Sequence, residues 1–263
     1  MEPINPKLFR QKDKLYHYTS LASAISILAT SKLFMSKLEG LNDINESYRH
    51  LSTYVKAGDE KEEWWKRLED AETELKNYWQ ISLSVDNPQP GFAIPAMWGH
   101  YAERGFGACI VLDKQAIISK LSQSDRYTYG QVTYHDDYDG GICVDGASIE
   151  YFESNKKEIF FQKTKDWACE QEFRIICRGD KEQAMIDLEG CVMAVILCYA
   201  RGIDNGKDSC FSSLAYKRLN SLFPNIPILE ACISDGEPNL WDADGNKWYP
   251  KEDIQDIIKT MDC

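Results

Sequence analysis

Hydrophobic and polar residues repeat along the chain with two periods, and each period predicts a kind of element. Apolar residues recur at helical spacing after Ser20, a residue type that caps helices, so residues 20–31 are predicted to be a helix. The same spacing makes residues 59–79 the clearest predicted helix, with acidic residues in its first turn. A short aromatic helix or turn and two further helices are predicted over residues 96–102, 146–162 and 208–222.

Period-two alternation and short apolar runs predict the strands. Residues 192–198 are apolar throughout, which is typical of a strand covered on both faces. An Asp-Gly turn within residues 240–249 predicts a hairpin. The alternative, a calcium-binding loop, is disfavoured because the glycine falls at the wrong place for the calcium-loop pattern. The other predicted strands cover residues 14–19, 33–36, 80–85, 105–112, 127–134 and 226–233.

Residues 167–177 have the least usual alternation in the chain. An apolar set alternates with a charged set, so the charged side chains share one face of a predicted strand: Glu170, Glu172 and Arg174. Glutamate is depleted in strands, which makes this composition informative. Two interpretations stay open at this point: a solvent-facing edge strand with a cross-strand ion pair, or a functional site.

The elements mix strands and helices without strict alternation, and no repeat or low-complexity linker separates two halves. We therefore predict the α+β class, with a single domain over residues 1–263.

Composition and charge narrow the function classes. The 263 residues carry a formal net charge of −12, and an acidic chain is not a general binder of nucleic acid or anionic membranes. The nine cysteines are scattered without a metal or disulfide spacing, so most are expected to be reduced and buried. There is no signal-like start and no apolar run of about eighteen residues, so we expect a cytoplasmic protein that does not contact a membrane.

Common catalytic signatures are absent from the sequence. It contains no P-loop, no H-E-x-x-H and no G-x-S-x-G motif, and no spacing argues for a metal site. What remains is a dispersed set of polar and aromatic residues: His17 in an aromatic strand, Asn42 and Asp43 with Glu46 in a predicted turn, and His100 and Tyr101 beside Trp98. Each has a structural interpretation as well, namely a core histidine, a turn, and a packed aromatic corner.

Taken in order, these residues carry a family resemblance. The series of four motifs resembles the bacterial domain-of-unknown-function family 2971: Leu15-Tyr-His-Tyr-Thr-Ser20, Leu41-Asn-Asp-x-x-Glu46, Met97-Trp-x-His-Tyr101 and Lys165-x-Trp-x-x-Glu-x-Glu-x-Arg174. The resemblance spans residues 14–200, which leaves residues 201–263 as a C-terminal extension of the same domain. Ile44 stands where the family pattern usually has proline. The family name implies no function.

A second resemblance implies a mechanism. An early strand with a histidine, a neighbouring helix and a late strand with Glu-x-Glu are similar to the ADP-ribosyltransferase layout, whose sheet is mixed and split and is flanked by helices. This resemblance implies that His17 holds a ribose hydroxyl of NAD, that Glu172 is the catalytic carboxylate and that Glu170 orients the acceptor. Arg174 would keep Glu172 ionised and contact the pyrophosphate.

The same resemblance implies a wider set of residues around NAD, the co-substrate. Its middle aromatic or Ser-Thr-Ser motif has no clean counterpart here, which leaves Tyr18, Tyr48, Trp98 and Tyr101 as candidates for stacking on nicotinamide. The implied cofactor-binding set is His17, Tyr18, Thr19, Asn42, Asp43, Trp98, His100, Tyr101 and Arg174.

Three functions follow as hypotheses. The first is an NAD-dependent ADP-ribosyltransferase or NAD glycohydrolase with an unidentified nucleic-acid or protein acceptor, in the superfamily's setting of toxins and phage-defence effectors. We expect Glu172→Gln to abolish its activity with little change in melting temperature. The second is a metal-dependent nuclease or phosphoester hydrolase, with Asp43, Glu46, Glu170 and Glu172 binding Mg²⁺ and His17 or His100 as base. The third is a non-catalytic module that binds a nucleotide or a partner.

Overall fold

The structure is a computed structural model, and it describes residues 4–40, 51–52, 61–136, 142–143, 154–182, 184–198, 213–233 and 238–249. The chain divides into two compact units, and each is built from separate stretches of sequence. The first unit comprises Met1–Lys32, Leu83–Lys120 and Asp187–Cys263, and the second comprises Leu33–Ser82 and Leu121–Ile186. That the chain forms one domain stays a prediction.

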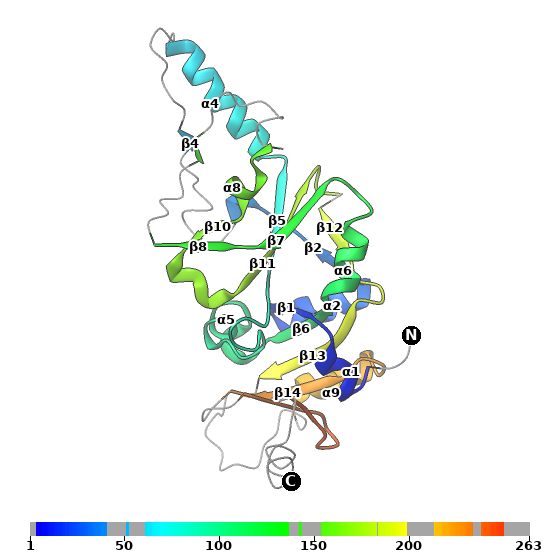
Figure 1. Cartoon of the computed structure of the whole chain (residues 1–263). Helices are drawn as coiled ribbons and strands as arrows, with labels where there is room; N and C mark the ends of the chain where they lie inside the picture. Colours follow the sequence, from blue (N-terminus) through cyan, green and yellow to red (C-terminus); the bar gives the residue numbers. More distant parts are fainter. Residues whose placement is uncertain are drawn as a thin grey trace. The chain divides into compact units, whose positions relative to one another are not determined.

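The first unit is a mixed sheet with short helices (Figure 1). Its strands lie in the order β16-β15-β14-β13-β6-β1, and the end of β5 joins β1 where Ser84 faces Tyr16. Strands β13 and β14 run parallel, whereas β6 is antiparallel to both β1 and β13. The strands are β1 Lys14–Thr19, β6 Ala108–Asp113, β13 Val192–Cys198, β14 Ile228–Cys232, β15 Asn239–Trp241 and β16 Lys247–Tyr249. The helices are α1 Pro6–Gln11, α2 Leu21–Thr30, α5 Pro95–Tyr101, η2 Glu103–Gly105, α6 Lys114–Leu121 and α9 Leu214–Leu222.

The core of the first unit lies on one face of β1. Tyr16 and Tyr18 point into this core, where the ring of Tyr18 meets Trp98 of α5 edge to face at 5.1 Å between centroids. Because side chains alternate along a strand, His17 points to the opposite face of β1, and it is half-buried. The strand therefore separates His17 from the aromatic core.

The second unit is built around the central strand β11, which lies between β5 and β7 (Figure 1). Strand β3 also pairs with β5, and three two-stranded pairs complete the unit: β10 with β8, β4 with β9 and β12 with β2. The strands are β2 Lys32–Phe34, β3 Ser36–Lys37, β4 Leu51–Ser52, β5 Tyr78–Ser84, β7 Tyr127–Gln131, β8 Thr133–His135, β9 Ile142–Cys143, β10 Gln162–Thr164, β11 Glu172–Arg178 and β12 Met185–Asp187. The helices are η1 Leu38–Gly40, α4 Lys61–Leu75, α8 Lys156–Phe160 and η3 Lys165–Glu170.

The strongest periodic patterns predict their elements well. Strands β1 and β13 have the bounds predicted for them, and α2 is capped by Ser20, whose side chain accepts a hydrogen bond from the backbone N–H of Ser23. The hairpin forms as β15 and β16, with its turn held by the carboxylate of Asp242, which accepts hydrogen bonds from Asn246 and Trp248. The mixed sheet and the helices together confirm the α+β class.

Several boundaries differ from their predictions. The predicted helix over 59–79 ends at Leu75, because the chain enters β5 at Tyr78. The predicted strand over 105–112 begins three residues late, since Gly105 belongs to η2. The predicted helices over residues 146–162 and 208–222 lie partly outside the described residues. In the described parts they correspond to α8 and α9, and Gln162 already belongs to β10.

Residues 167–177 require the main correction. Residues 165–170 form the 3-10 helix η3, and the strand begins only at Glu172 because Gln171 adopts a left-handed conformation with φ of 49°. Strand β11 is paired on both sides and its residues 172–177 are buried on both faces. The interpretation as a solvent-facing edge strand is therefore wrong.

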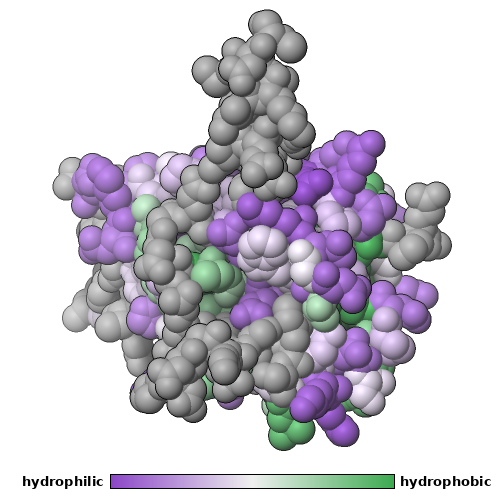
Figure 2. Space-filling view, turned by 90° about the horizontal axis from the view of Figure 1, so that it is seen from below, coloured by the Kyte–Doolittle hydropathy of each residue, from purple (hydrophilic) through white to green (hydrophobic). Residues whose placement is uncertain are grey.

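One face of the molecule is mainly hydrophilic where the structure describes its residues. Figure 2 shows a face on which hydrophilic side chains predominate and hydrophobic ones occur in small, separate patches. Across the described stretches, no helix combines the length and the apolar character needed to cross a membrane.

Candidate functional site

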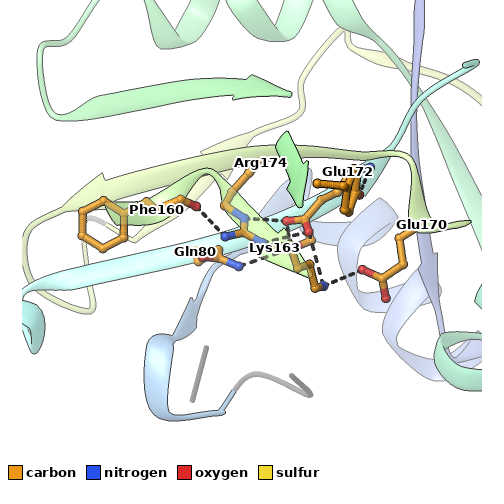
Figure 3. Close-up of polar contacts among 8 residues, drawn as sticks. Gln80, Phe160, Lys163, Glu170, Glu172 and Arg174 are labelled. Atoms are coloured by element: carbon orange, nitrogen blue, oxygen red, sulfur yellow. Dashed lines mark hydrogen bonds and ion pairs between the residues drawn. The ribbon is translucent and has the colours of Figure 1, made fainter. Parts of the chain in front are cut away.

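Four charged side chains meet in the second unit, and we call them the charge cluster: Lys163, Glu170, Glu172 and Arg174. They come from β10, the end of η3 and β11, and Figure 3 shows their side chains pointing toward one another. Each of these side chains is at most 6% exposed. Charged groups are rarely buried to this extent unless they are paired, and here two cations face two anions.

Arg174 holds Glu172 through a two-pronged ion pair. Its Nε donates to Oε1 of Glu172 at 2.6 Å and its Nη2 donates to Oε2 at 2.8 Å, while Nη1 donates to the carbonyl oxygen of Phe160. The two residues are two positions apart on β11, so the alternation of the strand puts them on one face. The guanidinium is 0% exposed. The contact between Arg174 and a pyrophosphate stays a prediction.

Lys163 connects the two carboxylates. Its Nζ donates to Oε2 of Glu170 at 2.7 Å and lies 3.5 Å from Oε2 of Glu172. The same nitrogen lies 4.6 Å from the centroid of the Trp167 ring, a cation–π distance. Although Gln171 breaks the strand, the side chain of Glu170 thus still reaches the cluster.

Two neighbouring hydroxyls complete the surroundings of Glu172. Ser82 of β5 donates to Oε1 at 2.6 Å, and Tyr134 of β8 accepts a hydrogen bond from the backbone N–H of Glu172 at 3.0 Å. Ser82 is exposed, which places Oε1 one hydrogen bond from solvent. Sequence reasoning missed Ser82, and the signal for it was the Ser82-Leu83-Ser84 alternation in a predicted strand.

Electrostatics favour the charged form of Glu172. Burial alone would raise the pKa of this carboxyl, but the Arg174 guanidinium, Lys163 and Ser82 together lower the pKa to about 2. Burial raises the pKa of Tyr134 well above its ordinary value. At neutral pH, Glu172 is therefore an ionised carboxylate in a water-poor setting beside a neutral phenol.

The first unit contains the other candidates that the structure describes. His17 is half-buried on β1, and burial lowers its pKa to about 4, so the imidazole is neutral at physiological pH. Thr19, also half-buried, ends the same strand. On α5, His100 is exposed and Tyr101 is half-buried, with 6.3 Å between their ring centroids.

Tyr18 and Trp98 occupy a different environment. The hydroxyl of Tyr18 donates to the carbonyl oxygen of Gly91 at 2.5 Å, and Nε1 of Trp98 donates to that of Phe92 at 2.7 Å. Both rings are at most 5% exposed and belong to the core of the first unit, on the face of β1 opposite His17. These contacts give the two rings a packing role.

The predicted residues thus form two sets. Glu170, Glu172 and Arg174 come together in the second unit, whereas the candidates of the first unit are His17, Tyr18, Thr19, Trp98, His100 and Tyr101. Asn42 and Asp43, like Glu46 and Tyr48, lie outside the described residues. Within the parts of the chain that the structure describes, no three histidine, cysteine or acidic side chains gather in a way that would hold a metal ion.

Comparison with protein families tests the resemblance of the motifs. Residues 97–175 match the family described as protein of unknown function (DUF2971). The resemblance predicted from the motifs is therefore confirmed over residues 97–175. The DUF2971 match contains the motifs at 97–101 and 165–174, and with them the whole charge cluster, while the motifs at 15–20 and 41–46 precede it.

No curated protein and no solved structure matches the chain. Since the DUF2971 description assigns no activity, the function has to be argued from the residues themselves.

Proposed function

We propose that this protein is an NAD-dependent ADP-ribosyltransferase or NAD glycohydrolase. The observation that carries the proposal is the carboxylate of Glu172, which is buried, ionised and oriented by Arg174. The Glu170-x-Glu172 pair belongs to the same cluster, as the resemblance to ADP-ribosyltransferases requires.

The chemistry needs such a carboxylate. Nicotinamide leaves with the electron pair of its bond to ribose C1′, and the sugar develops the positive charge of an oxocarbenium ion. A fixed negative charge close to C1′ stabilises that transition state more than the ground state, and its effect is larger where water is excluded. Ser82 brings Oε1 of Glu172 within one hydrogen bond of solvent, which is the side from which NAD would approach.

The second carboxylate completes the transfer. An acceptor oxygen or nitrogen forms a new bond to C1′, and Glu170 takes the proton that the acceptor loses. In the transferase the acceptor is a group on a protein or nucleic acid, and in the glycohydrolase it is water. Ser82 holds the catalytic carboxylate through its hydroxyl, which donates to Oε1 of Glu172.

The remaining roles belong to the same proposal. In this proposal the neutral His17 accepts or donates a hydrogen bond at a ribose hydroxyl, and Tyr101, half-buried on α5, is a candidate to stack on nicotinamide. We place the protein in the cytoplasm, as a bacterial toxin or phage-defence effector by analogy with the superfamily.

One observation favours a second candidate, a non-catalytic module that binds a nucleotide or a partner. Both carboxylate oxygens of Glu172 already accept hydrogen bonds from Arg174, and Oε1 also accepts one from Ser82. A carboxylate engaged in this way also suits a purely structural role. The two candidates differ in whether nicotinamide is released.

The deciding experiment is calorimetric titration with NAD in EDTA, together with an assay of nicotinamide release. The variant is Glu172→Gln, and the matched control is Glu74→Gln. Glu74 is another buried glutamate of the second unit, 8% exposed, and its Oε1 accepts from Nε of Arg178 at 2.7 Å. Both substitutions remove a buried glutamate from an ion pair with arginine, so both are expected to lower the melting temperature. Arg178 is 35% exposed whereas Arg174 is 0% exposed, and only Glu172 lies in the charge cluster.

We expect the wild type to bind NAD and release nicotinamide. Glu172→Gln should lower the release rate by about 10²- to 10³-fold, the usual effect of removing one preorganised electrostatic group, while Glu74→Gln retains the rate. Absence of both heat and release in the wild type overturns the proposal and leaves the non-catalytic module. Equal loss in the two variants would assign Glu172 a structural role only.

A further inference from the structure

Lys163 is the residue of the charge cluster that sequence reasoning gave no role. Its ammonium is 5% exposed and ion-pairs with a carboxylate from η3 and another from β11. Both Oε2 atoms lie close to this one nitrogen, at 2.7 Å for Glu170 and 3.5 Å for Glu172. Lys163 therefore bridges the two carboxylates.

Without a cation between them, two buried carboxylates cannot both stay ionised at neutral pH, because desolvation and mutual repulsion favour protonation of one. Arg174 makes its two-pronged pair with Glu172, whereas Lys163 pairs with both Glu170 and Glu172. Tyr134, whose hydroxyl accepts from the backbone N–H of Glu172, is a neutral phenol at physiological pH. Lys163 thus places positive charge beside both carboxylates.

Two contacts fix the lysine itself. Its strand β10 pairs in parallel with β8, which places Lys163 beside Tyr134 in register, and its ammonium lies over the ring of Trp167. A lysine side chain has many rotamers, so these contacts limit the positions of its nitrogen.

We propose that Lys163 is a positioning residue that supplies positive charge beside Glu170 and Glu172 and holds the two carboxylates at a fixed spacing for the transfer step. This inference rests on the proposed function, in which one carboxylate stabilises the sugar cation while the other takes the acceptor's proton. Lys163 itself contacts neither sugar nor acceptor. It acts through the two carboxylates.

The test compares Lys163→Met, which removes the charge, with Lys163→Arg, which keeps it. Lys163→Gln, a neutral variant that retains a hydrogen-bond donor, serves if the methionine variant fails to fold. The control is Lys165→Met, which removes a lysine of the same segment that is 64% exposed and pairs with Asp136 at the surface.

The first measurement is melting temperature against pH, which requires no substrate. In the wild type, the contribution of Glu172 to stability is present above its unfolded pKa and disappears as pH falls toward about 2. In Lys163→Met and Lys163→Gln this loss should begin at higher pH, because Glu172 loses one of the positive charges that lower its pKa. Lys163→Arg and Lys165→Met should follow the wild type.

The second measurement is nicotinamide release against pH. Removing the charge should lower kcat by about 10- to 100-fold, the size expected for displaced catalytic groups, and move the acidic limb of the profile to higher pH, with little change in KM for NAD. The arginine variant should restore most of the rate.

The two measurements separate the possible failures. If the neutral variants melt with the pH profile of the wild type, the inference about Lys163 is wrong whatever the substrate is. If the profile shifts but the wild type releases no nicotinamide, the proposed function fails and the inferred role in catalysis fails with it. A lower rate with an unshifted acidic limb contradicts the electrostatic role and leaves only packing.

Discussion

Because Glu172 is buried, the substitution Glu172→Gln is expected to affect stability as well as activity. The sequence led us to expect a nearly unchanged melting temperature for Glu172→Gln, as for a residue whose role is catalytic and not structural. In the folded protein its partner Arg174 is 0% exposed, and removing one member of a buried ion pair typically costs about 3–5 kcal/mol. Loss of activity in this variant is therefore informative only beside Glu74→Gln, which removes another buried glutamate from an ion pair with arginine.

His17 gives a prediction at the scale of a single residue. Its pKa in the folded protein is about 4, below the ordinary value of 6.5, so between these two pH values the unfolded chain binds a proton that the folded chain does not. Stability therefore falls as pH drops through this window, by about 1–3 kcal/mol after allowance for partial exposure. The substitution His17→Gln removes the ionisable imidazole and with it this dependence of stability on pH.

The measurement is the free energy of unfolding of the wild type and of His17→Gln at neutral and acidic pH. The difference between the two proteins should change across the window. His100→Gln, at an exposed histidine of the same unit, is the control and should track the wild type. A constant difference between wild type and His17→Gln would mean that His17 is solvated in the native protein.

At the scale of elements, the segment from η3 to β11 shows that a period-two alternation does not by itself predict where a strand begins. The alternation from Glu170 to Arg174 predicts a single strand, but Gln171, with φ of 49°, divides it into a 3-10 helix and a strand. A left-handed conformation at a residue other than glycine has no signature in a hydrophobic pattern. The side chain of Glu170 reaches Lys163 all the same, because the lysine comes from β10.

The turn between α5 and β6 gives a prediction at this scale. Gly107 lies against the backbone of Ala102 and Thr19, so that an added Cβ would come within 2.8 Å of the carbonyl carbon of Ala102. Gly107→Ala should therefore lower the free energy of unfolding by about 1–3 kcal/mol, as overpacking does. Gly99, within α5, has nothing within 4 Å of an added Cβ, so Gly99→Ala should raise it by about 0.5–1 kcal/mol.

Chemical denaturation of the two alanine variants measures both effects. Their opposite signs make the comparison independent of any general cost of substitution in this region. Equal stability of Gly107→Ala and the wild type would show that the end of β1 can move away from the turn.

At the scale of the whole molecule, net charge controls which partners can approach. The chain carries a formal charge of −12, and the surface in Figure 2 is mainly hydrophilic. A polyanion such as duplex DNA is repelled by such a charge unless a basic patch offsets it. The acceptor in the proposed transfer is then more readily a protein than a duplex.

We accordingly expect no binding of random-sequence duplex DNA at about 0.15 M salt, and no gain on lowering the salt concentration, because no counterions are released on contact. Fluorescence anisotropy of labelled DNA over a salt series provides the measurement. Binding that strengthens steeply at low salt would reveal a basic patch and make a nucleic-acid acceptor the first choice.

The sequence by itself determined the α+β class and the elements with the strongest periods, such as β1, α2 and β13, because helix capping and side-chain alternation are local properties. It also pointed to Glu170, Glu172 and Arg174 as an unusual group. Only the tertiary structure decided that these charges are buried and paired. Their partners Ser82 and Lys163 come from other elements, Ser82 from 90 residues away, and the alternation along one strand contains no information about which side chains cover it.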